Sequence, residues 1–369
     1  MKKSLMTGTC LVMANIVGWS GDLTTIGPDD PKIAYAGFVH REFVSMPDSP
    51  EGKVARFDRV IDMPGTGYRF DNPGARIRFR TDARTIVASL HYNERHQSKS
   101  ARNSVGVYSV DDVFKPEWSF RTRETAVQRD PETVQVALAV DGDGGFHEYE
   151  IFLPYGDSVD FAGLKVKPDA RLEPIEAEPR IRYVAYGDSV TQGFTAGGID
   201  KTYPFLVAKE KGWEAINLGL GGRSSGSSPA DAQTITSLKA DVISLFIGVN
   251  DWQGSVPPER YRANLEAFVS NIRKTQPKTP VYLLTSLWVA PNWSKPSGQV
   301  NDLETYRQVL RDLVEARNDP NLHLVEGVDL IDPDPLLFDK VAVHPNDEGF
   351  AMMAERLAEK LNEPPGKSE

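Results

Sequence analysis

The sequence has little of what several classes of protein depend on. Cys10 is the only cysteine among 369 residues, which excludes an intramolecular disulfide and a thiolate metal cluster. Acidic residues outnumber basic ones by 52 to 42, and the formal net charge of −10 argues against a nucleic-acid partner, which would need a basic face. No apolar run reaches the roughly 18 residues of a membrane-spanning helix, so we expect no membrane span.

The first residues leave the cellular location open. Two lysines precede a moderately apolar run over residues 5–19, and Gly18 and Ser20 are small residues of the kind found at signal cleavage sites. The same run also contains Thr7, Thr9 and Asn15, which argue against a signal peptide. Segment 1–28 is therefore either a signal-like segment of a secreted or periplasmic protein, or an N-terminal arm, in which case a cytoplasmic location is the alternative.

The first half of the chain predicts short strands separated by turns. Arg76 to Arg80 alternates in polarity, with Ile77 and Phe79 on one face. Similar strand-like segments are 85–90, 105–110, 134–140 and 148–153. No amphipathic helix is recognisable before residue 170. Strands at this spacing indicate an all-β sandwich of jelly-roll type, which we assign to residues 29–172.

The pattern changes after a proline- and charge-rich segment, which predicts a linker at residues 173–180. Over residues 181–364, apolar runs alternate with amphipathic stretches of helical length. The apolar runs are 182–186, 214–218, 242–247, 281–285 and 322–325, and the helical stretches are 202–211, 229–239, 258–274, 302–317 and 346–361. This alternation predicts an α/β domain with a parallel sheet covered by helices on both faces, which binds ligands at the carboxyl ends of its strands.

Chemically distinctive residues follow three of these runs. After the first comes Gly187-Asp-Ser-Val-Thr-Gln-Gly193, a tight turn that leads a serine into a helix. After the second, the glycines of Asn217-Leu-Gly-Leu-Gly-Gly-Arg-Ser224 let backbone N–H groups approach a substrate oxygen. Gly248-Val-Asn-Asp251 follows the third run, and His344-Pro-Asn-Asp-Glu-Gly349 precedes the last helix. Together they supply what acyl transfer needs: a nucleophile, an imidazole base and oxyanion donors.

With these motifs, residues 181–364 resemble the SGNH (GDSL-like) hydrolase superfamily, whose four named residues match Ser189, Gly222, Asn250 and His344. The resemblance implies a flavodoxin-like α/β/α fold with Ser189 as nucleophile, His344 as general base, and neither a metal nor another cofactor. It implies three oxyanion donors, namely the backbone N–H groups of Ser189 and Gly222 and the side-chain amide of Asn250.

One position departs from the pattern of the superfamily. An aspartate usually stands three residues before the histidine, and here that position is Val341. The nearest upstream carboxylate is Asp339, five residues before His344. Either the loop bulges so that Asp339 orients His344, or a backbone carbonyl does so and the protein uses a Ser–His dyad. The sequence leaves both alternatives open.

A repeated pentapeptide provides an internal control. Residues 155–159 repeat residues 186–190 letter for letter, but they lie in the β-rich half of the chain. Neither oxyanion glycines nor a histidine motif follows them in that half. We therefore expect Ser158 to be a turn residue and Ser189 to be the nucleophile.

The combination of a β-rich domain with an SGNH domain also resembles carbohydrate esterase family two, which pairs a jelly roll with this hydrolase and removes acetyl groups from sugars. The resemblance rests on the architecture and on stretches such as Ala55–Asp58, Gly74–Phe79 and Leu153–Gly156. It implies an esterase for short-chain (acetyl) esters, with an acetylated oligosaccharide or polysaccharide as substrate.

Three tryptophans follow strand ends of the second domain, where an aromatic face could stack on a sugar ring. They are Trp252, Trp288 and Trp293, and the alternative is that they pack the loops. Two other functions also stay open. One is a lysophospholipase, thioesterase or arylesterase with the same machinery. The other is a non-catalytic carbohydrate-binding protein, against which the complete set of motifs argues.

Overall fold

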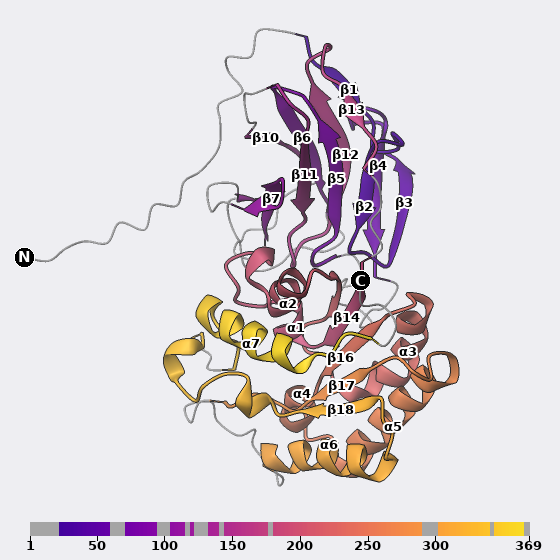
Figure 1. The fold of residues 1–369 in the computed structure, drawn as a ribbon, viewed down its shortest axis with the longest axis vertical. Coiled ribbons are helices and arrows are strands. Elements are labelled where there is room, and N and C mark those ends of the chain that lie inside the picture. Colours follow the sequence, from indigo (N-terminus) through magenta and orange to yellow (C-terminus); the bar gives the residue numbers. More distant parts are fainter. Residues whose placement is uncertain are drawn as a thin grey trace, which may run out of the picture.

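A computed structural model describes nine stretches of the chain, on which everything below rests. They are residues 22–59, 71–93, 104–114, 119–121, 132–139, 144–175, 180–289, 302–339 and 343–364. An all-β domain (indigo to magenta in Figure 1) is followed by an α/β domain (pink to yellow). No helix in these stretches has the length and apolarity needed to cross a membrane.

The all-β domain consists of two antiparallel sheets. Its strands are β1 (Thr24–Ile26), β2 (Ala34–Ala36), β3 (His40–Ser45), β4 (Lys53–Asp58), β5 (Arg76–Thr81), β6 (Ile86–Tyr92), β7 (Val105–Val110), β8 (Val113–Phe114), β9 (Phe120–Arg121), β10 (Glu132–Leu138), β11 (His147–Phe152), β12 (Val159–Val166) and β13 (Leu172–Glu173). One sheet has the order β10-β6-β12-β4-β3, with β1 on β12. The other has the order β13-β5-β11-β7-β8, with β2 on β5 and β9 on β7.

The core of this domain lies between the two sheets, because alternate residues of each strand point inwards. In β5, Ile77 and Phe79 are fully buried, whereas Arg78 and Arg80 are half-buried. The Phe79 ring stacks on Tyr149 of the neighbouring β11, with ring centroids 5.2 Å apart. The predicted all-β sandwich is confirmed.

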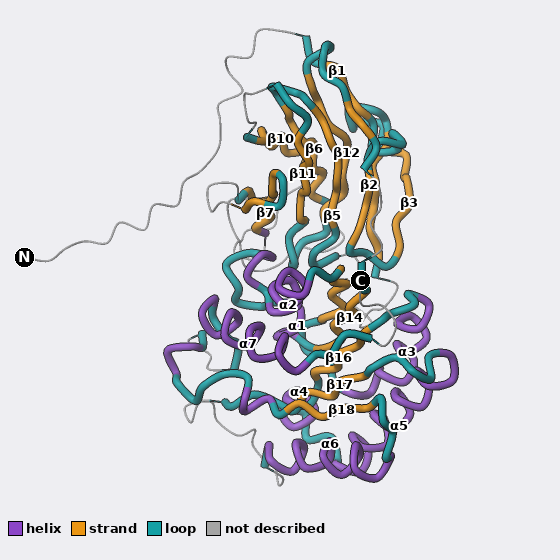
Figure 2. The backbone as a smooth tube through the Cα atoms, in the orientation of Figure 1, coloured by secondary structure: helices purple, strands orange, loops and turns teal. Residues whose placement is uncertain are grey.

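The α/β domain contains a five-stranded parallel sheet, which is orange in Figure 2. The strands are β14 (Arg182–Gly187), β15 (Glu214–Gly219), β16 (Val242–Phe246), β17 (Val281–Leu284) and β18 (Leu322–Val325). The helices are α1 (Ser189–Gln192), α2 (Tyr203–Lys211), α3 (Ser228–Ser237), α4 (Val249–Gln253), α5 (Pro258–Thr275), α6 (Leu303–Arg317) and α7 (Asp347–Lys360). The strand order β15-β14-β16-β17-β18 is that of flavodoxin-like sheets, which confirms the predicted fold class.

Helices cover both faces of this sheet because its strands are apolar on both sides. Val184 and Tyr186 of β14 belong to a buried cluster with residues of α3, α5 and α6. Tyr183 and Ala185, which point the other way, belong to a second cluster with α2 and α7. The sheet is therefore buried on both faces, and its carboxyl edge is the part open to a ligand.

The predicted domain boundaries, 29–172 and 181–364, remain predictions. β1 begins at Thr24 and pairs with β12, so a part of segment 1–28 belongs to the sandwich. Residues 1–21 lie outside the described residues, as do residues 176–179 of the expected linker.

The two domains are in direct contact (Figure 1). The Tyr155 hydroxyl of the sandwich donates to the backbone oxygen of Ala196 at 2.8 Å. The rings of Phe152 in β11 and Phe205 in α2 meet edge to face, with centroids 5.1 Å apart. The sandwich thus packs on the part of the α/β domain that follows the first strand of the parallel sheet.

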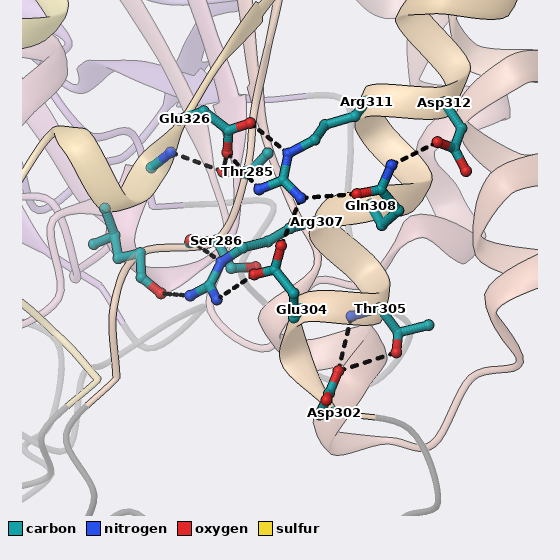
Figure 3. Close-up of polar contacts among 12 residues, drawn as sticks. Thr285, Ser286, Asp302, Glu304, Thr305, Arg307, Gln308, Arg311, Asp312 and Glu326 are labelled. Carbon is teal, nitrogen blue, oxygen red and sulfur yellow. Dashed lines mark hydrogen bonds and ion pairs between the residues drawn. The ribbon is translucent and has the colours of Figure 1, made fainter.

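Polar side chains of α6 anchor the segment that leaves β17 (Figure 3). Arg307 donates to the backbone oxygens of Ser286 and Leu287, at 2.9 and 2.6 Å. Arg311, one turn further along α6, forms an ion pair with Glu326 at 2.6 Å. The Arg307 contacts hold the chain where it leaves β17 at the carboxyl edge of the sheet, and the Arg311 ion pair holds it where it leaves β18.

Candidate active site

The candidate site lies at the carboxyl ends of three neighbouring strands. α1 follows β14, a glycine-rich loop at residues 220–224 follows β15, and α4 follows β16. Leu220 N–H donates to the Gly187 oxygen at 3.0 Å, which joins the first two connections. The Asn250 side-chain amide donates to the Arg223 oxygen at 2.9 Å, which joins the second and third. The three motifs recognised in the sequence therefore meet at one edge.

Ser189 is positioned by the turn between β14 and α1. Asp188 caps the helix, since its carboxylate accepts a hydrogen bond from Val190 N–H at 2.9 Å. Burial raises the pKa of Asp188 to about 7, against the lowering effect of that hydrogen bond. The turn ends at Gly193, whose φ of 101° is in the left-handed region. Ser189 itself stays half-buried, so its hydroxyl can meet a substrate.

The Ser189 hydroxyl is hydrogen-bonded to the imidazole of His344. Oγ and Nε2 are 2.8 Å apart, although 155 positions separate the two residues in the sequence. Burial lowers the pKa of His344 to about 4. The imidazole is therefore neutral at pH 7, and it can accept the serine proton. The ring of Phe194 packs against the imidazole, with centroids 4.9 Å apart.

Asp339 lies opposite His344 in the loop before α7. Phe338 pairs with Pro345 as an isolated β-bridge, and Asp339 N–H donates to the His344 oxygen at 2.8 Å. The negative charge of Asp339 raises the pKa of His344, although burial outweighs it. Nδ1 of His344 is buried and has no hydrogen-bond partner among the described residues, while Val341 lies outside them. The choice between a triad and a dyad stays open.

The expected oxyanion donors belong to the same edge, although no ligand tests their roles. Gly222 is exposed and has a φ of +78°, a conformation that favours glycine. Asn250 is half-buried at the start of α4. Gly219 is required for close packing, because a Cβ at this position would lie 2.0 Å from the backbone nitrogen of Gln192. The assignment of Ser189, Gly222 and Asn250 as donors stays a prediction.

Three residues near this edge were missed by the sequence reasoning. Gln192, Asp71 and Arg59 form a buried hydrogen-bonded chain that ends on the glycine-rich loop. Gln192 lies within the first motif and could have been noticed there. Asp71 and Arg59 belong to the all-β domain, and no local signal connects them with the site.

The tryptophans differ in how they could meet a ligand. Trp252 is only 5% exposed and packs in the cluster under α5 and α6, so it offers almost no face for stacking on a sugar. This burial argues against the sugar contact expected for it. Trp288 is half-buried against Phe338, with ring centroids 5.5 Å apart, and keeps part of its surface open. Trp293 lies outside the described residues.

The repeated pentapeptide in the all-β domain lacks this machinery. Ser158 lies between β11 and β12, fully buried, and its hydroxyl has no hydrogen-bond partner among the described residues. Among the same residues there is no cluster of His, Cys, Asp or Glu that could hold a metal ion.

Serine hydrolases have a serine hydroxyl that is hydrogen-bonded to a neutral imidazole. Ser189 and His344 show this arrangement at the carboxyl edge of a flavodoxin-like sheet. Residues 185–352 match the model of the GDSL-like Lipase/Acylhydrolase family. The resemblance of this part of the chain to GDSL-like hydrolases, seen in the sequence, is confirmed. No curated protein matches the chain.

Several solved structures are similar to this chain over both domains. The salicylyl-acyltransferase SsfX3 from a tetracycline biosynthetic pathway is 22% identical, with a TM-score of 0.72, over 90% of this chain and 95% of that one. A putative GDSL-like lipase from Bacteroides ovatus is 19% identical, with a TM-score of 0.71, over 93% and 99%. A family two carbohydrate esterase from Cellvibrio japonicus is 16% identical, with a TM-score of 0.65, over 92% and 97%. At these identities the likeness establishes the fold alone.

Proposed function

We propose that the protein is a serine esterase that hydrolyses short-chain esters, in particular O-acetyl groups on a carbohydrate. The observation that carries the proposal is the 2.8 Å hydrogen bond between Ser189 Oγ and His344 Nε2 within a GDSL-like domain. The likeness to a family two carbohydrate esterase covers the β sandwich as well as the hydrolase domain, which supports an acetylated oligosaccharide or polysaccharide as substrate.

The reaction would proceed through an acyl-enzyme. His344 Nε2 takes the proton from Ser189 Oγ as this oxygen attacks the ester carbonyl. When the bond between the carbonyl carbon and the sugar oxygen breaks, the imidazolium protonates that oxygen, and the sugar leaves as an alcohol. The N–H groups of Ser189 and Gly222 and the amide of Asn250 would stabilise the oxyanion. Water, activated by His344, then releases acetate from Ser189.

The charge of Asp339 would assist the histidine in this mechanism. The imidazole becomes positively charged when it takes the serine proton, and burial makes that charge costly. Asp339 counteracts this cost through space, since its negative charge raises the pKa of His344. We therefore propose a Ser–His pair with electrostatic support in place of a hydrogen-bonded third member.

Transfer of the acyl group to an alcohol is the second candidate function. The specific observation in its favour is the similarity to a salicylyl-acyltransferase over 90% of this chain. Both activities would use the same acyl-enzyme and differ only in whether water or a bound hydroxyl attacks it. A lysophospholipase, thioesterase or arylesterase would instead need room for a long or aromatic acyl chain.

Acetate release from a panel of acetylated polysaccharides tests the proposal directly. We expect release by the wild-type protein and none by Ser189→Ala. A p-nitrophenyl ester series from acetate to octanoate, run with and without added sugar alcohols, distinguishes the alternatives. Octanoate turning over faster than acetate would favour a lipase-type enzyme, and acylated alcohol in place of free acetate would favour transfer.

We also propose a secreted or periplasmic location, with the part of segment 1–28 that precedes β1 as a signal-like segment. The proposal fits a polymeric substrate that is too large to enter a cell. N-terminal sequencing of the protein from its natural source tests it, because cleavage within the segment is expected. An intact Met1 in a cytoplasmic fraction would contradict it.

A further inference from the structure

A chain of buried hydrogen bonds connects the β sandwich with the glycine-rich loop of the candidate site. Asp71 of the sandwich accepts from the Arg59 guanidinium at 2.6 Å and, through its other oxygen, from the Gln192 side-chain amide at 2.7 Å. Gln192 in turn accepts from Gly221 N–H at 2.8 Å. Arg59 donates to the Gly219 oxygen. The carboxylate of Asp71 therefore accepts hydrogen bonds from both side chains, Arg59 and Gln192, that contact the backbone at residues 219–221.

These side chains are removed from solvent. Asp71 is fully buried, Arg59 is 1% exposed and Gln192 is 4% exposed. A buried hydrogen-bonded ion pair contributes little to stability in net terms, but losing one partner is costly because the other is left buried and unpaired. Such a network is more effective at fixing a geometry than at stabilising the fold.

The loop that the network contacts is rich in glycine. Three glycines lie within residues 219–222, which span the end of β15 and the start of the loop, and glycine has little conformational preference of its own. In addition to the hydrogen bonds that Leu220 and Arg223 form within the α/β domain, Arg59 and Gln192 anchor the backbone at Gly219 and Gly221, directly before Gly222. Gly222, with its φ of +78°, carries the N–H group expected to bind the oxyanion.

We propose that Asp71 is a positioning residue for the oxyanion hole, through which the β sandwich completes the active site of the α/β domain. This proposal rests on the proposed esterase function. Asp71 does not contact the substrate. It orients Arg59 and Gln192, which hold the loop so that Gly222 N–H points at the developing negative charge. The sandwich is then a part of the catalytic unit, whatever else it binds.

The first test is Asp71→Asn, which keeps the shape of the side chain but loses its charge and one acceptor oxygen. We expect kcat for acetyl ester hydrolysis to fall at least 10-fold, with KM within about threefold, because the loop acts on charge that develops only in the transition state. The matched control is Asp160→Asn, which removes the charge of another fully buried carboxylate of the sandwich, the one that pairs with the half-buried Arg56. Its kcat should stay near the wild-type value.

The second test reverses the polarity of one hydrogen bond. Gln192→Glu still accepts from Gly221, but it places a second carboxyl group against Asp71, near Arg59 and Asp157. We expect low activity at pH 8 that rises towards pH 5.5, where the two carboxyl groups share a proton. In the double variant Asp71→Asn/Gln192→Glu, the amide introduced at position 71 can donate to the carboxylate introduced at position 192, and the net charge is that of the wild type. The double variant should be at least fivefold more active at pH 8 than Gln192→Glu alone.

The outcomes separate this inference from the proposed function. Three results would overturn the positioning role, provided that the wild-type protein hydrolyses esters. They are an unchanged kcat in folded Asp71→Asn, an equal loss of kcat in Asp160→Asn, and no rescue of activity in the double variant. If Asp71→Asn does not fold, the pH profile of Gln192→Glu and the activity of the double variant test the positioning role instead. If the wild-type protein hydrolyses no ester, the proposed function fails. The rate at which a fluorophosphonate labels Ser189 then measures the same oxyanion geometry, and equal rates in all variants would refute the inference.

Discussion

Acidification should reveal how deeply the catalytic imidazole is buried. Burial lowers the pKa of His344 from 6.5 to about 4. This shift means that burial destabilises the protonated ring by about 3 kcal/mol relative to the neutral ring. A general base must be neutral to accept a proton. Activity therefore persists above the pKa that His344 has in the folded protein, and it is lost as pH falls through that pKa. At pH 5, about 90% of the molecules would keep a neutral His344, against about 3% at a pKa of 6.5.

The assay is kcat/KM for acetate release between pH 3.5 and 8 at constant ionic strength, with circular dichroism at each pH to exclude acid unfolding. We expect the titration of His344 to give an acidic limb with a midpoint near pH 4. Asp71 and Asp188 have pKa values raised by burial to about 7 and could add a limb of their own. The titration of the His344 ring protons by NMR, assigned with His344→Gln, therefore serves as the direct measurement. A ring pKa of 6 or above in the folded protein would refute the reasoning.

The remaining predictions concern single side chains and the acyl group. Ser189→Ala should abolish ester hydrolysis with the thermal midpoint unchanged, while Ser158→Ala should stay near wild type in the same assay; the reverse result would move the site to the sandwich. Asn250→Ala should lower kcat by roughly 10²–10³, the usual loss for one oxyanion donor. An effect on KM alone in steady-state kinetics would contradict the role of Asn250 as an oxyanion donor. Asp339→Asn should cost less than about 100-fold in kcat, whereas a loss near the roughly 10⁴ seen for a triad carboxylate would make it a third member. Turnover should be fastest on acetate among p-nitrophenyl esters and unaffected by EDTA, and loss of activity with the chelator would indicate a required metal.

The sequence by itself determined the elements and most of the chemistry. Alternation at Arg76–Arg80 and the apolar runs such as Arg182–Tyr186 match β5 and β14, because side-chain periodicity follows directly from strand geometry. The four motifs of the candidate site were recognisable because each is local: a tight turn, a glycine run or a helix start has a signature within a few residues. The pairing of Ser189 with His344 followed from these motifs together, and the structure agrees at 2.8 Å.

Only the tertiary structure decided what depends on distant parts of the chain. Arg59 donates to the Gly219 oxygen, directly before the glycine-rich loop, across 160 positions, and no local pattern indicates such a contact. Trp252 follows a catalytic motif, a position expected of a ligand-binding residue, yet the packing of α5 and α6 buries it. The pKa of His344 likewise depends on burial by residues from several elements. Periodicity specifies which face of an element is apolar, but the neighbours that cover that face, and the dielectric environment that they create, are set by the assembled fold.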